Sequence, residues 1–449
     1  MSAETQDPNP VEKVAGPGTS SRRASAAAFA GTVLEYYDLV IYGTAAALVF
    51  SDVFFADVSP QIALMLSFAT FASGYIARPL GAVLFGHIGD RHGRRTALMI
   101  TIWLMGAATV LIGLLPTYAT VGAIAPVLLV VLRLGQGLAI GGELGGAVLI
   151  SVEHAPAHRR GFFGSFSTAG GQAGTVLATG VFALVTLMPD EQFRLWGWRI
   201  PFLLSALIVI VGLIIRNKLT EPPDFQKAST TQTARKSPLR IALTHHWRAI
   251  LGLMVIQAGM MAAWYFLTVY TLSYVVENLS IDRTTFLGLV TAAALLVVVM
   301  NPVWGALSDR FGRRKVLAGG LAAEGALLVV FVAALGTQNV PLILLALLAV
   351  AGIGHAAANG TYPAYLVESL PSEARYTAGS LALQLAGVVG GFIPLIAVSL
   401  EGSMLGIWAT TLICFAFCLV GALCVQWLGT SRASAEQSET PDKQLHKQT

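Results

Sequence analysis

The chain has 449 residues, of which 55% are hydrophobic and only 12% are charged, and its mean hydropathy is +0.70. A soluble domain carries about 25% charged residues, so this composition excludes an ordinary water-soluble protein and predicts a surface that faces lipid. The net charge of +4 does not indicate nucleic-acid binding, because the basic residues lie in short loops between apolar segments, a distribution that sets orientation in a membrane.

Residues 1–24 are predicted to form a disordered tail, since the first part of the chain is polar and rich in Pro, Gly and Ser. Apolar runs of about 20 residues, long enough to cross ~30 Å of hydrocarbon, then recur along the chain. The first run is too long for the core of a signal peptide, so we expect it to be a membrane helix. The twelve predicted spans are residues 26–50, 62–86, 97–115, 123–151, 162–187, 199–216, 249–275, 285–306, 316–335, 341–367, 377–399 and 405–428.

A polar stretch between the sixth and seventh spans divides the chain into two halves. We predict an N-terminal six-helix bundle over 25–217, a cytoplasmic linker over 218–247, a C-terminal six-helix bundle over 248–428 and a polar tail over 429–449. All but five of the 28 Lys and Arg residues fall on one predicted side of the membrane, and the exceptions are Arg78, Arg133, Arg194, Arg199 and Arg283. The positive-inside rule therefore predicts that the linker and both termini are cytoplasmic.

Two sequence signatures occur once in each half. Gly-x3-Asp-Arg-x-Gly-Arg-Arg begins at Gly86 after the second span and at Gly305 after the eighth. Glu-x2-Pro-x3-Arg begins at Glu153 after the fourth span and at Glu368 after the tenth. Two signatures in the same order at matching places indicate a duplication, with the halves related by an axis along the membrane normal. The predicted fold class is all-α, with twelve transmembrane helices in two pseudo-symmetric six-helix bundles.

The first signature has the chemistry of a conformational gate. Its glycines let two helix ends approach closely, and its aspartate can cap a helix N-terminus or pair with an arginine of a neighbouring helix. A basic turn that only sets orientation is the alternative for one copy, and the second copy favours a gate. The predicted gate residues are Gly86, Asp90, Arg91, Gly93 and Arg94 in the first half, and Gly305, Asp309, Arg310, Gly312 and Arg313 in the second.

These turns resemble the signature of the major facilitator superfamily, and four further motifs make the resemblance more specific. They are Gly31-Thr-Val-Leu-Glu35-Tyr-Tyr-Asp38, Arg133-Leu-Gly-Gln136-Gly137, Gly141-Gly142-Glu143 followed by Gly145-Gly146, and Trp196-Gly-Trp198-Arg199-Ile-Pro201-Phe202. Together they are similar to the metabolite:proton symporter family over about residues 22–428, and to its shikimate-type and other organic-acid members in particular. The resemblance implies a major facilitator fold, transport rather than enzymatic activity, protons as the coupling ion with no other cofactor, and a bacterial inner (plasma) membrane location.

Ionisable residues inside the spans are candidates for proton coupling, because such a residue is unfavourable in hydrocarbon unless it is paired or hydrated. We expect Asp38 to be the leading proton site, followed by Glu35 and Glu143. Arg133, which the resemblance ties to proton coupling, is expected to pair with the acid or to bind a substrate carboxylate. Structural ion pairs that fix helix register are the alternative. In the fold that the resemblance implies, the ninth span is peripheral, so Glu324 within it is expected to have a role in structure or assembly.

A substrate site is expected near the membrane midplane, lined by polar and aromatic residues of several spans. Each of these residues could instead serve in packing or in the interfacial aromatic belt. His355 is expected to be a hydrogen-bonded structural residue, and no metal site is expected because the three cysteines share one apolar segment that lacks histidine. The candidate substrate-binding residues are Arg78, Arg133, Tyr42, Gln136, Gln172, Gln257, Trp264, Tyr265, Asn359, Tyr362 and Gln384.

The predicted function is uptake of a small organic anion, such as shikimate, α-ketoglutarate or a related carboxylate, together with protons by alternating access. The arginines inside the spans favour an anion over a zwitterion such as proline or betaine, which is the alternative substrate class. An exporter or a transporter-like sensor is a weaker alternative, and an ATP-driven pump or membrane enzyme is disfavoured by the lack of the corresponding motifs. The expected partners are the organic acid, the proton and the lipid bilayer, with a monomer as the functional unit.

Overall fold

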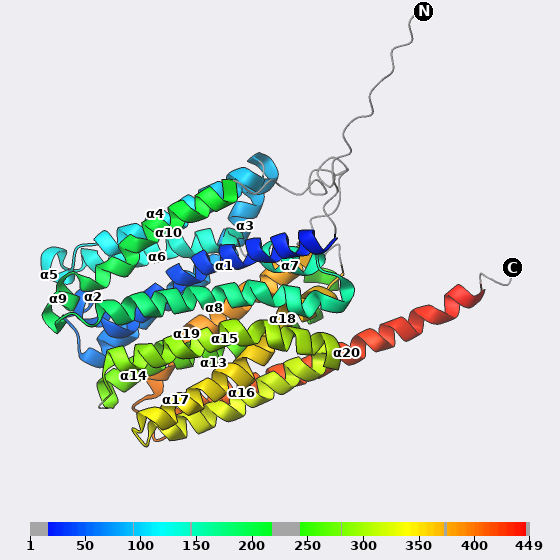
Figure 1. Cartoon of the computed structure of the whole chain (residues 1–449). Coiled ribbons are helices and arrows are strands. Elements are labelled where there is room, and N and C mark those ends of the chain that lie inside the picture. The colour runs from blue at the N-terminus through cyan, green and yellow to red at the C-terminus, as the bar shows by residue number, and fades with distance from the viewer. Residues whose placement is uncertain are drawn as a thin grey trace, which may run out of the picture.

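The structure is a computed structural model that describes residues 17–92, 94–143, 146–217, 243–279, 281–371 and 375–445. These ranges form a bundle of long helices packed side by side, without a β-strand among them (Figure 1). Helices are the elements that satisfy their own backbone hydrogen bonds, which is what a hydrocarbon surrounding requires. The start of α1 and the end of α20 lie at the same end of the bundle.

Six long helical segments and several short ones make up the first half. The long ones are α1 (Pro17–Leu48), α3 (Pro60–His92), α4 (Arg94–Leu114), α6 (Ile124–Glu143), which α7 (Gly146–Glu153) follows in the same predicted span, α8 (Arg160–Val185) and α10 (Ile200–Asn217). The connections contain α2 (Phe50–Phe54), α5 (Tyr118–Val121), the 3₁₀ turn η1 (Ala157–Arg159), α9 (Asp190–Leu195) and the 3₁₀ turn η2 (Gly197–Arg199).

The second half has six further spans, two of which contain a wider π-helical turn. Its elements are α13 (Trp247–Tyr265), the π turn η3 (Phe266–Tyr270), α14 (Thr271–Asn278), α15 (Arg283–Phe311), α16 (Arg313–Leu335), α17 (Val340–Ala349), the π turn η4 (Val350–His355), α18 (Ala356–Ser369), α19 (Arg375–Leu400) and α20 (Ile407–Leu445).

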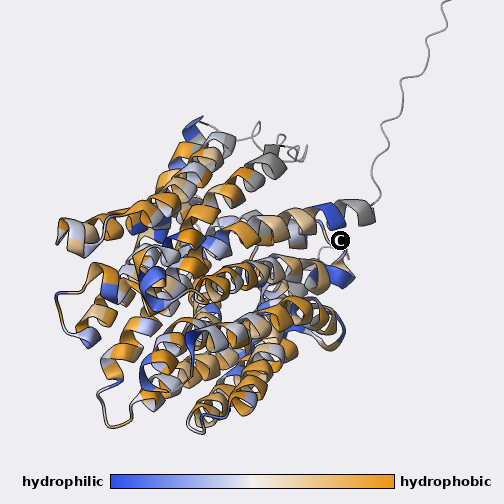
Figure 2. Cartoon of the chain, turned by 60° about the vertical axis from the view of Figure 1, so that its left-hand side comes forward, coloured by the Kyte–Doolittle hydropathy of each residue, from blue (hydrophilic) through white to orange (hydrophobic). Residues whose placement is uncertain are grey.

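Helices occupy all of the predicted spans. Within the described ranges, nine helical segments are long and apolar enough to cross a membrane, and α1, α4 and α10 occupy the three remaining predicted spans. Hydrophobic residues cover the long sides of the helices, whereas hydrophilic ones concentrate at helix ends and loops (Figure 2). Large apolar side chains such as Leu80, Leu184 and Leu345 are exposed on this outer surface, as expected where lipid is the solvent. The predicted fold class is confirmed.

The structure differs from the sequence prediction at the N-terminal end of the chain, and it adds a helix in the polar tail at the C-terminal end. Helix α1 begins at Pro17, so residues 17–24, predicted to belong to a disordered tail, are helical. Ser21 stabilises this N-terminal part of α1 by donating a hydrogen bond to the carbonyl oxygen of His154. Helix α20 continues to Leu445, through most of the predicted tail. Residues 218–242, which make up most of the predicted linker, lie outside the described residues.

Glycines bring helices of the first half into backbone contact. A Cβ atom at Gly137 of α6 would lie 2.1 Å from the carbonyl oxygen of Gly74 on α3, and one at Gly141 would lie 2.0 Å from that of Arg78. Real Cβ atoms do not approach backbone this closely, so α3 and α6 can pack in this way only with glycine at these positions. This packing sets where the side chains of Arg78 and Arg133 enter the bundle.

The two halves meet along α8 with α15 and along α3 with α19. At the second contact the side chain of Tyr75 on α3 lies against two glycines of α19, and a Cβ atom at Gly391 would be 2.4 Å from its ring. The Tyr75 hydroxyl donates a hydrogen bond to the hydroxyl of Tyr265 on α13. Aromatic side chains therefore fill the centre of the interface between the halves.

Candidate functional site

A small cavity lies at the centre of the interface between the two halves. The first half contributes residues of α1 and α3, and the second half contributes residues of α13 and α19. Its volume is about 30 Å³, which is room for a water molecule but not for an organic acid. The lining residues are Glu35, Tyr36, Leu39, Arg78, Gln257, Met261, Tyr265 and Leu383.

Arg78 is the cation of this cavity. Its side chain is buried, and the guanidinium lies over the ring of Tyr75, 4.0 Å from the centroid. Its Nε and Nη2 atoms have no hydrogen-bond partner among the described residues. An arginine buried at membrane depth is unfavourable unless its donors are satisfied, so this arrangement is suited to binding an anion.

Asp38 lies in the first half, between α1, α4 and α10. It is 1% exposed, and its carboxylate accepts hydrogen bonds from Ser205 (Oγ to Oδ1, 2.5 Å) and from Thr109 (Oγ1 to Oδ2, 3.0 Å). Sequence reasoning did not identify these two hydroxyl residues. A carboxylate inside a span needs donors, but the sequence does not show which helices face it.

Arg133 does not pair directly with Asp38, although the two were predicted to be candidates for a pair. Its Nη1 donates to Oε1 of Gln136 (2.5 Å), and Nε2 of Gln136 donates to Oγ1 of Thr109 (2.7 Å), the residue that also contacts Asp38. A chain of three hydrogen bonds therefore connects the arginine to the acid. Movement of Arg133 would change the hydrogen bonds that Asp38 receives.

The guanidinium of Arg133 lies in an aromatic enclosure. It is 4.0 Å from the centroid of the Tyr42 ring and 5.3 Å from that of Phe71, and the side chain is 1% exposed. A Cβ atom at Gly74 would lie 2.4 Å from Nε of Arg133, so glycine is needed beside it. Cation–π contacts of a desolvated arginine contribute about 2 kcal/mol. Arg133 is thus separate from the residues that line the cavity.

The remaining predicted substrate-binding residues fall in three places. Gln257 and Tyr265 line the cavity, and Gln384 lies buried beside its lining residue Leu383, with both amide atoms unpartnered within the described chain. Gln172 and Trp264 contact His355 instead. Two tyrosines of the set form hydrogen bonds within the protein: Tyr42 donates to Thr70, and Tyr362 donates to the carbonyl of Leu253. Asn359 is half-buried on α18 and does not line the cavity.

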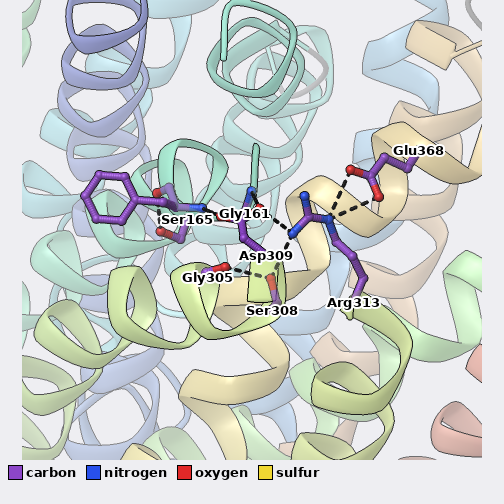
Figure 3. A network of polar contacts seen from close by, with 8 residues as sticks. Gly161, Ser165, Gly305, Ser308, Asp309, Arg313 and Glu368 are labelled. Carbon is purple, nitrogen blue, oxygen red and sulfur yellow. Dashed lines mark hydrogen bonds and ion pairs between the residues drawn. The ribbon is translucent and has the colours of Figure 1, made fainter. Parts of the chain in front are cut away.

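The gate signature of the second half contacts the first half directly (Figure 3). The carboxylate of Asp309, at the end of α15, accepts hydrogen bonds of 2.9 Å from the backbone N–H groups of both Gly161 and Phe162, in the first turn of α8. Arg313 forms ion pairs with Asp309 at 2.7 Å and with Glu368 at 3.0 Å. An anion at a helix N-terminus is stabilised by the unpaired N–H groups and the helix dipole, so this contact holds the halves together.

The other gate residues have different roles. Gly305 meets Gly161 closely enough that a Cβ atom would lie 2.5 Å from its carbonyl oxygen, whereas a Cβ at Gly86 of the first half would meet nothing within 4 Å. Gly312 ends α15 with a φ of 95°, a backbone conformation that favours glycine. Arg91 and Arg310 are exposed. Gly93 and the side chains of Asp90, Arg94 and Glu143 lie outside what the structure describes.

The second repeated signature also joins the two halves. Arg375, the arginine of the second copy, donates to Glu153, the glutamate of the first copy, at 2.9 Å. At the opposite end of the bundle, Arg283 of α15 pairs with Asp190 of α9 at 2.6 Å. Contacts between the halves are therefore present at both ends, with the small cavity between them.

Comparison with known proteins gives matches over both halves. A profile described as sugar (and other) transporter matches residues 24–242, and one described as major facilitator superfamily matches residues 253–448. The shikimate transporter of Escherichia coli K12 is 40% identical over 408 residues, which cover 90% of this chain and 93% of that protein. The proline/betaine transporter of Salmonella typhimurium is 34% identical over 386 residues, covering 84% of this chain and 77% of that protein.

Solved structures and a further relative agree with these matches. The inner membrane metabolite transport protein YhjE of Escherichia coli K12 is 40% identical over 397 residues, covering 86% of this chain and 89% of that protein. A partially occluded inward-open structure of the xylose transporter XylE from E. coli has a TM-score of 0.70 at 18% identity, covering 90% of this chain and 97% of that one, which shows a shared fold. These proteins are transporters rather than enzymes. The chain belongs to the metabolite transporter family of the major facilitator superfamily.

Proposed function

We propose that the protein is a proton-coupled symporter that takes up a small organic anion such as shikimate, α-ketoglutarate or a related carboxylate. The observation that carries this proposal is Arg78, a buried guanidinium in the cavity between the halves with two unpartnered donor atoms in the described chain. A carboxylate offers two acceptor oxygens in the geometry that a guanidinium prefers. A shikimate transporter among the relatives supports this substrate class, because shikimate is a carboxylate.

Substrate would reach this cavity by alternating access. The cavity is too small for an organic acid, and ion pairs connect the halves at both ends, so binding requires the halves to separate at one end. The contacts at the other end would keep the path closed at the same time. Ion pairs and helix-terminus hydrogen bonds that bridge the halves are suited to this task, because they break and re-form without unfolding either half.

Asp38 is proposed as the proton-binding residue of the cycle. Its carboxylate is buried, and its hydrogen-bond donors are neutral hydroxyl groups, so it can hold a proton without breaking an ion pair. The chain through Thr109 and Gln136 connects it to Arg133 on the same half. A rearrangement of Arg133 as the halves move would then alter the environment of Asp38 and release the proton.

The membrane orientation is also a proposal. The excess of Lys and Arg on one predicted side favours placing the Asp309 end of the bundle and both termini in the cytoplasm, in a bacterial inner membrane. Both halves of one chain line the cavity, which supports a monomer as the functional unit.

Uptake of a zwitterion such as proline or betaine is the second candidate. Glu35 lines the same cavity as Arg78, so the cavity presents one acidic and one basic side chain. A zwitterion carries both complementary charges. A proline/betaine transporter is among the relatives.

Uptake by the purified protein in liposomes under an inward proton gradient tests the proposal. The panel would contain labelled shikimate, α-ketoglutarate, citrate, an aromatic acid, proline and betaine. We expect one acid to accumulate and a protonophore to abolish the accumulation. Accumulation of proline or betaine alone would establish the zwitterion alternative, and the absence of gradient-dependent uptake of any compound would refute proton symport.

Replacing Arg78 with Gln should raise the KM for an anionic substrate by about 10- to 100-fold, because a hydrogen bond to a charged group contributes roughly 1.5–3 kcal/mol. Arg248→Gln, the same substitution at an exposed position of α13, should leave the KM unchanged. Glu35→Gln should weaken uptake of a zwitterion more than uptake of an acid. Initial uptake rates over a range of substrate concentrations provide the measurement, and an unchanged KM in Arg78→Gln would contradict its role.

A further inference from the structure

A further buried acid, outside the lining of the cavity, lies in the C-terminal half. Glu324 on α16 is fully buried, and its Oε1 lies 2.8 Å from Nδ1 of His355, the last residue of the π turn η4. The ninth span packs this glutamate against the tenth span, so the side chain faces the inside of the half. Gly354 permits this approach, since a Cβ atom there would lie 2.5 Å from Cα of Glu324.

The imidazole of His355 has partners on two further helices. The indole of Trp264, the penultimate residue of α13, stacks on it with a centroid distance of 4.2 Å and an interplanar angle of 14°. Its Nε2 atom lies 3.4 Å from Nε2 of Gln172 on α8, which belongs to the other half. The spans that contain Trp264 and His355 each include a π turn, η3 and η4 respectively. Such turns are frequent at functional sites.

Among the described residues, His355 is the only cation that can compensate Glu324. The other charged residues that are buried in the described chain, Glu35, Asp38, Arg78 and Arg133, all lie on α1, α3 and α6 of the first half. Around the pair, α8 contributes Gln172, α13 contributes Trp264, and α15 has its ionisable side chains at its ends. From α20, Cys414 and Cys418 lie near Glu324. On α18, the hydroxyls of Tyr362 and Tyr365 donate to backbone carbonyls, and Glu368 near the end of the helix pairs with Arg313.

The pair can exist with or without one additional proton. Without it, neutral His355 donates Nδ1–H to the ionised Glu324, Nε2 carries no hydrogen, and the pair has one net negative charge. With it, the pair is neutral, as imidazolium and carboxylate, and Nε2 carries the added hydrogen. A buried uncompensated carboxylate is unfavourable by several kcal/mol, so proton binding removes a large electrostatic penalty.

Gln172 is placed to respond to this proton. When Nε2 of His355 is bare, it can accept a hydrogen bond from the amide nitrogen of Gln172, which is the atom that faces it. When Nε2 carries a hydrogen it needs an acceptor, and the amide oxygen of Gln172 has no partner in the part of the chain that the structure describes. Rotation of the amide would exchange the two atoms. The direction of a hydrogen bond between the halves therefore depends on the protonation of the pair.

We propose that Glu324 and His355 form a second proton-binding centre, and that Gln172 transmits its protonation state across the interface between the halves. A proton taken from water onto Nε2 of His355 neutralises the pair and reverses the hydrogen bond to α8. The role of this centre in alternating access rests on the proton-coupled function proposed above, whereas proton binding itself does not. The centre is separate from Asp38, which lies in the first half.

Trp264 provides a direct optical measurement, because a protonated imidazole stacked on an indole quenches its fluorescence. Subtracting the emission of Trp264→Phe from that of the wild-type protein isolates this tryptophan among the eight in the chain. We expect a reversible loss of the Trp264 emission as the pH is lowered. The step should be absent in His355→Gln, and its midpoint should move by about one pH unit or more in Glu324→Gln.

Two further variants complete the test. His158→Gln replaces an exposed histidine on η1 and should leave the step unchanged. Gln172→Met should retain the step but lose proton-driven accumulation of substrate while counterflow persists. A flat titration of the wild-type protein, or a step that survives in both His355→Gln and Glu324→Gln, would overturn the proton-binding centre whether or not the protein transports. A normal step in a protein that accumulates no substrate would instead refute the proposed function.

Discussion

Replacing Asp38 with Asn should abolish proton-driven accumulation of substrate and leave exchange of substrate across the membrane intact. The carboxylate is buried and receives hydrogen bonds from Ser205 and Thr109. Asparagine has nearly the same shape and retains one acceptor oxygen, so the packing between α1, α4 and α10 should persist, but its amide binds no proton. A carrier without its proton site moves substrate only down the substrate's own gradient. Accumulation under an imposed proton gradient and counterflow, measured in the same liposomes, separate the two activities.

An exposed aspartate of the first half, Asp52, allows the same Asp-to-Asn substitution as a matched control. Asp52 on α2 forms an exposed ion pair with Arg194, and exposed pairs contribute about 0–1 kcal/mol. Asp52→Asn should therefore preserve both accumulation and counterflow. Undiminished accumulation in Asp38→Asn would remove Asp38 from the coupling mechanism. Loss of counterflow together with accumulation would show that the residue is needed for substrate movement itself.

The fold was predictable because hydrocarbon restricts what the chain can do. A span must be helical and about 20 residues long, so apolar runs alone locate most of the helices. Helix α1 is less apolar than the nine segments above, because Glu35 and Asp38 lie within it, and the apolar residues on either side of them still predicted its position. The helical continuation of α20 to Leu445 was not predictable in the same way, since hydropathy carries no information on polar residues beyond the membrane.

The ionisable residues of the spans were predictable as candidates, but their partners were not. A charge in a span is conspicuous in the sequence, whereas its environment depends on which helices are neighbours. Asp38 accepts hydrogen bonds from residues of α4 and α10, whereas the guanidinium of Arg133 lies over the ring of Tyr42. The two residues are therefore connected only through other side chains. The partner of Glu324 could not be predicted for the same reason, since nothing in the sequence shows that η4 brings His355 to it.

Gly161→Ala should prevent the halves from closing at the Asp309 end of the bundle. A Cβ atom at Gly161 would lie 2.3 Å from the carbonyl oxygen of Gly305, which is backbone and cannot rotate away. Separation of α8 from α15 would also lengthen the hydrogen bonds that Asp309 accepts from Gly161 and Phe162. Since overpacking costs about 1–3 kcal/mol and the cycle requires this end to close, transport should fall by about 10- to 100-fold. Gly305→Ala should have the same effect.

Glycines elsewhere on α8 and α15 serve as controls. Their substitution by alanine separates the effect of overpacking this contact from the effect of alanine on helix stability. A Cβ atom at Gly180 of α8 or Gly288 of α15 would meet nothing within 4 Å, so Gly180→Ala and Gly288→Ala should transport like the wild-type protein in counterflow measurements. Alanine favours helix over glycine by about 1 kcal/mol at all four positions. A loss confined to Gly161 and Gly305 must therefore arise where the halves touch, and equal transport by all four variants would show that this contact is not needed for the cycle.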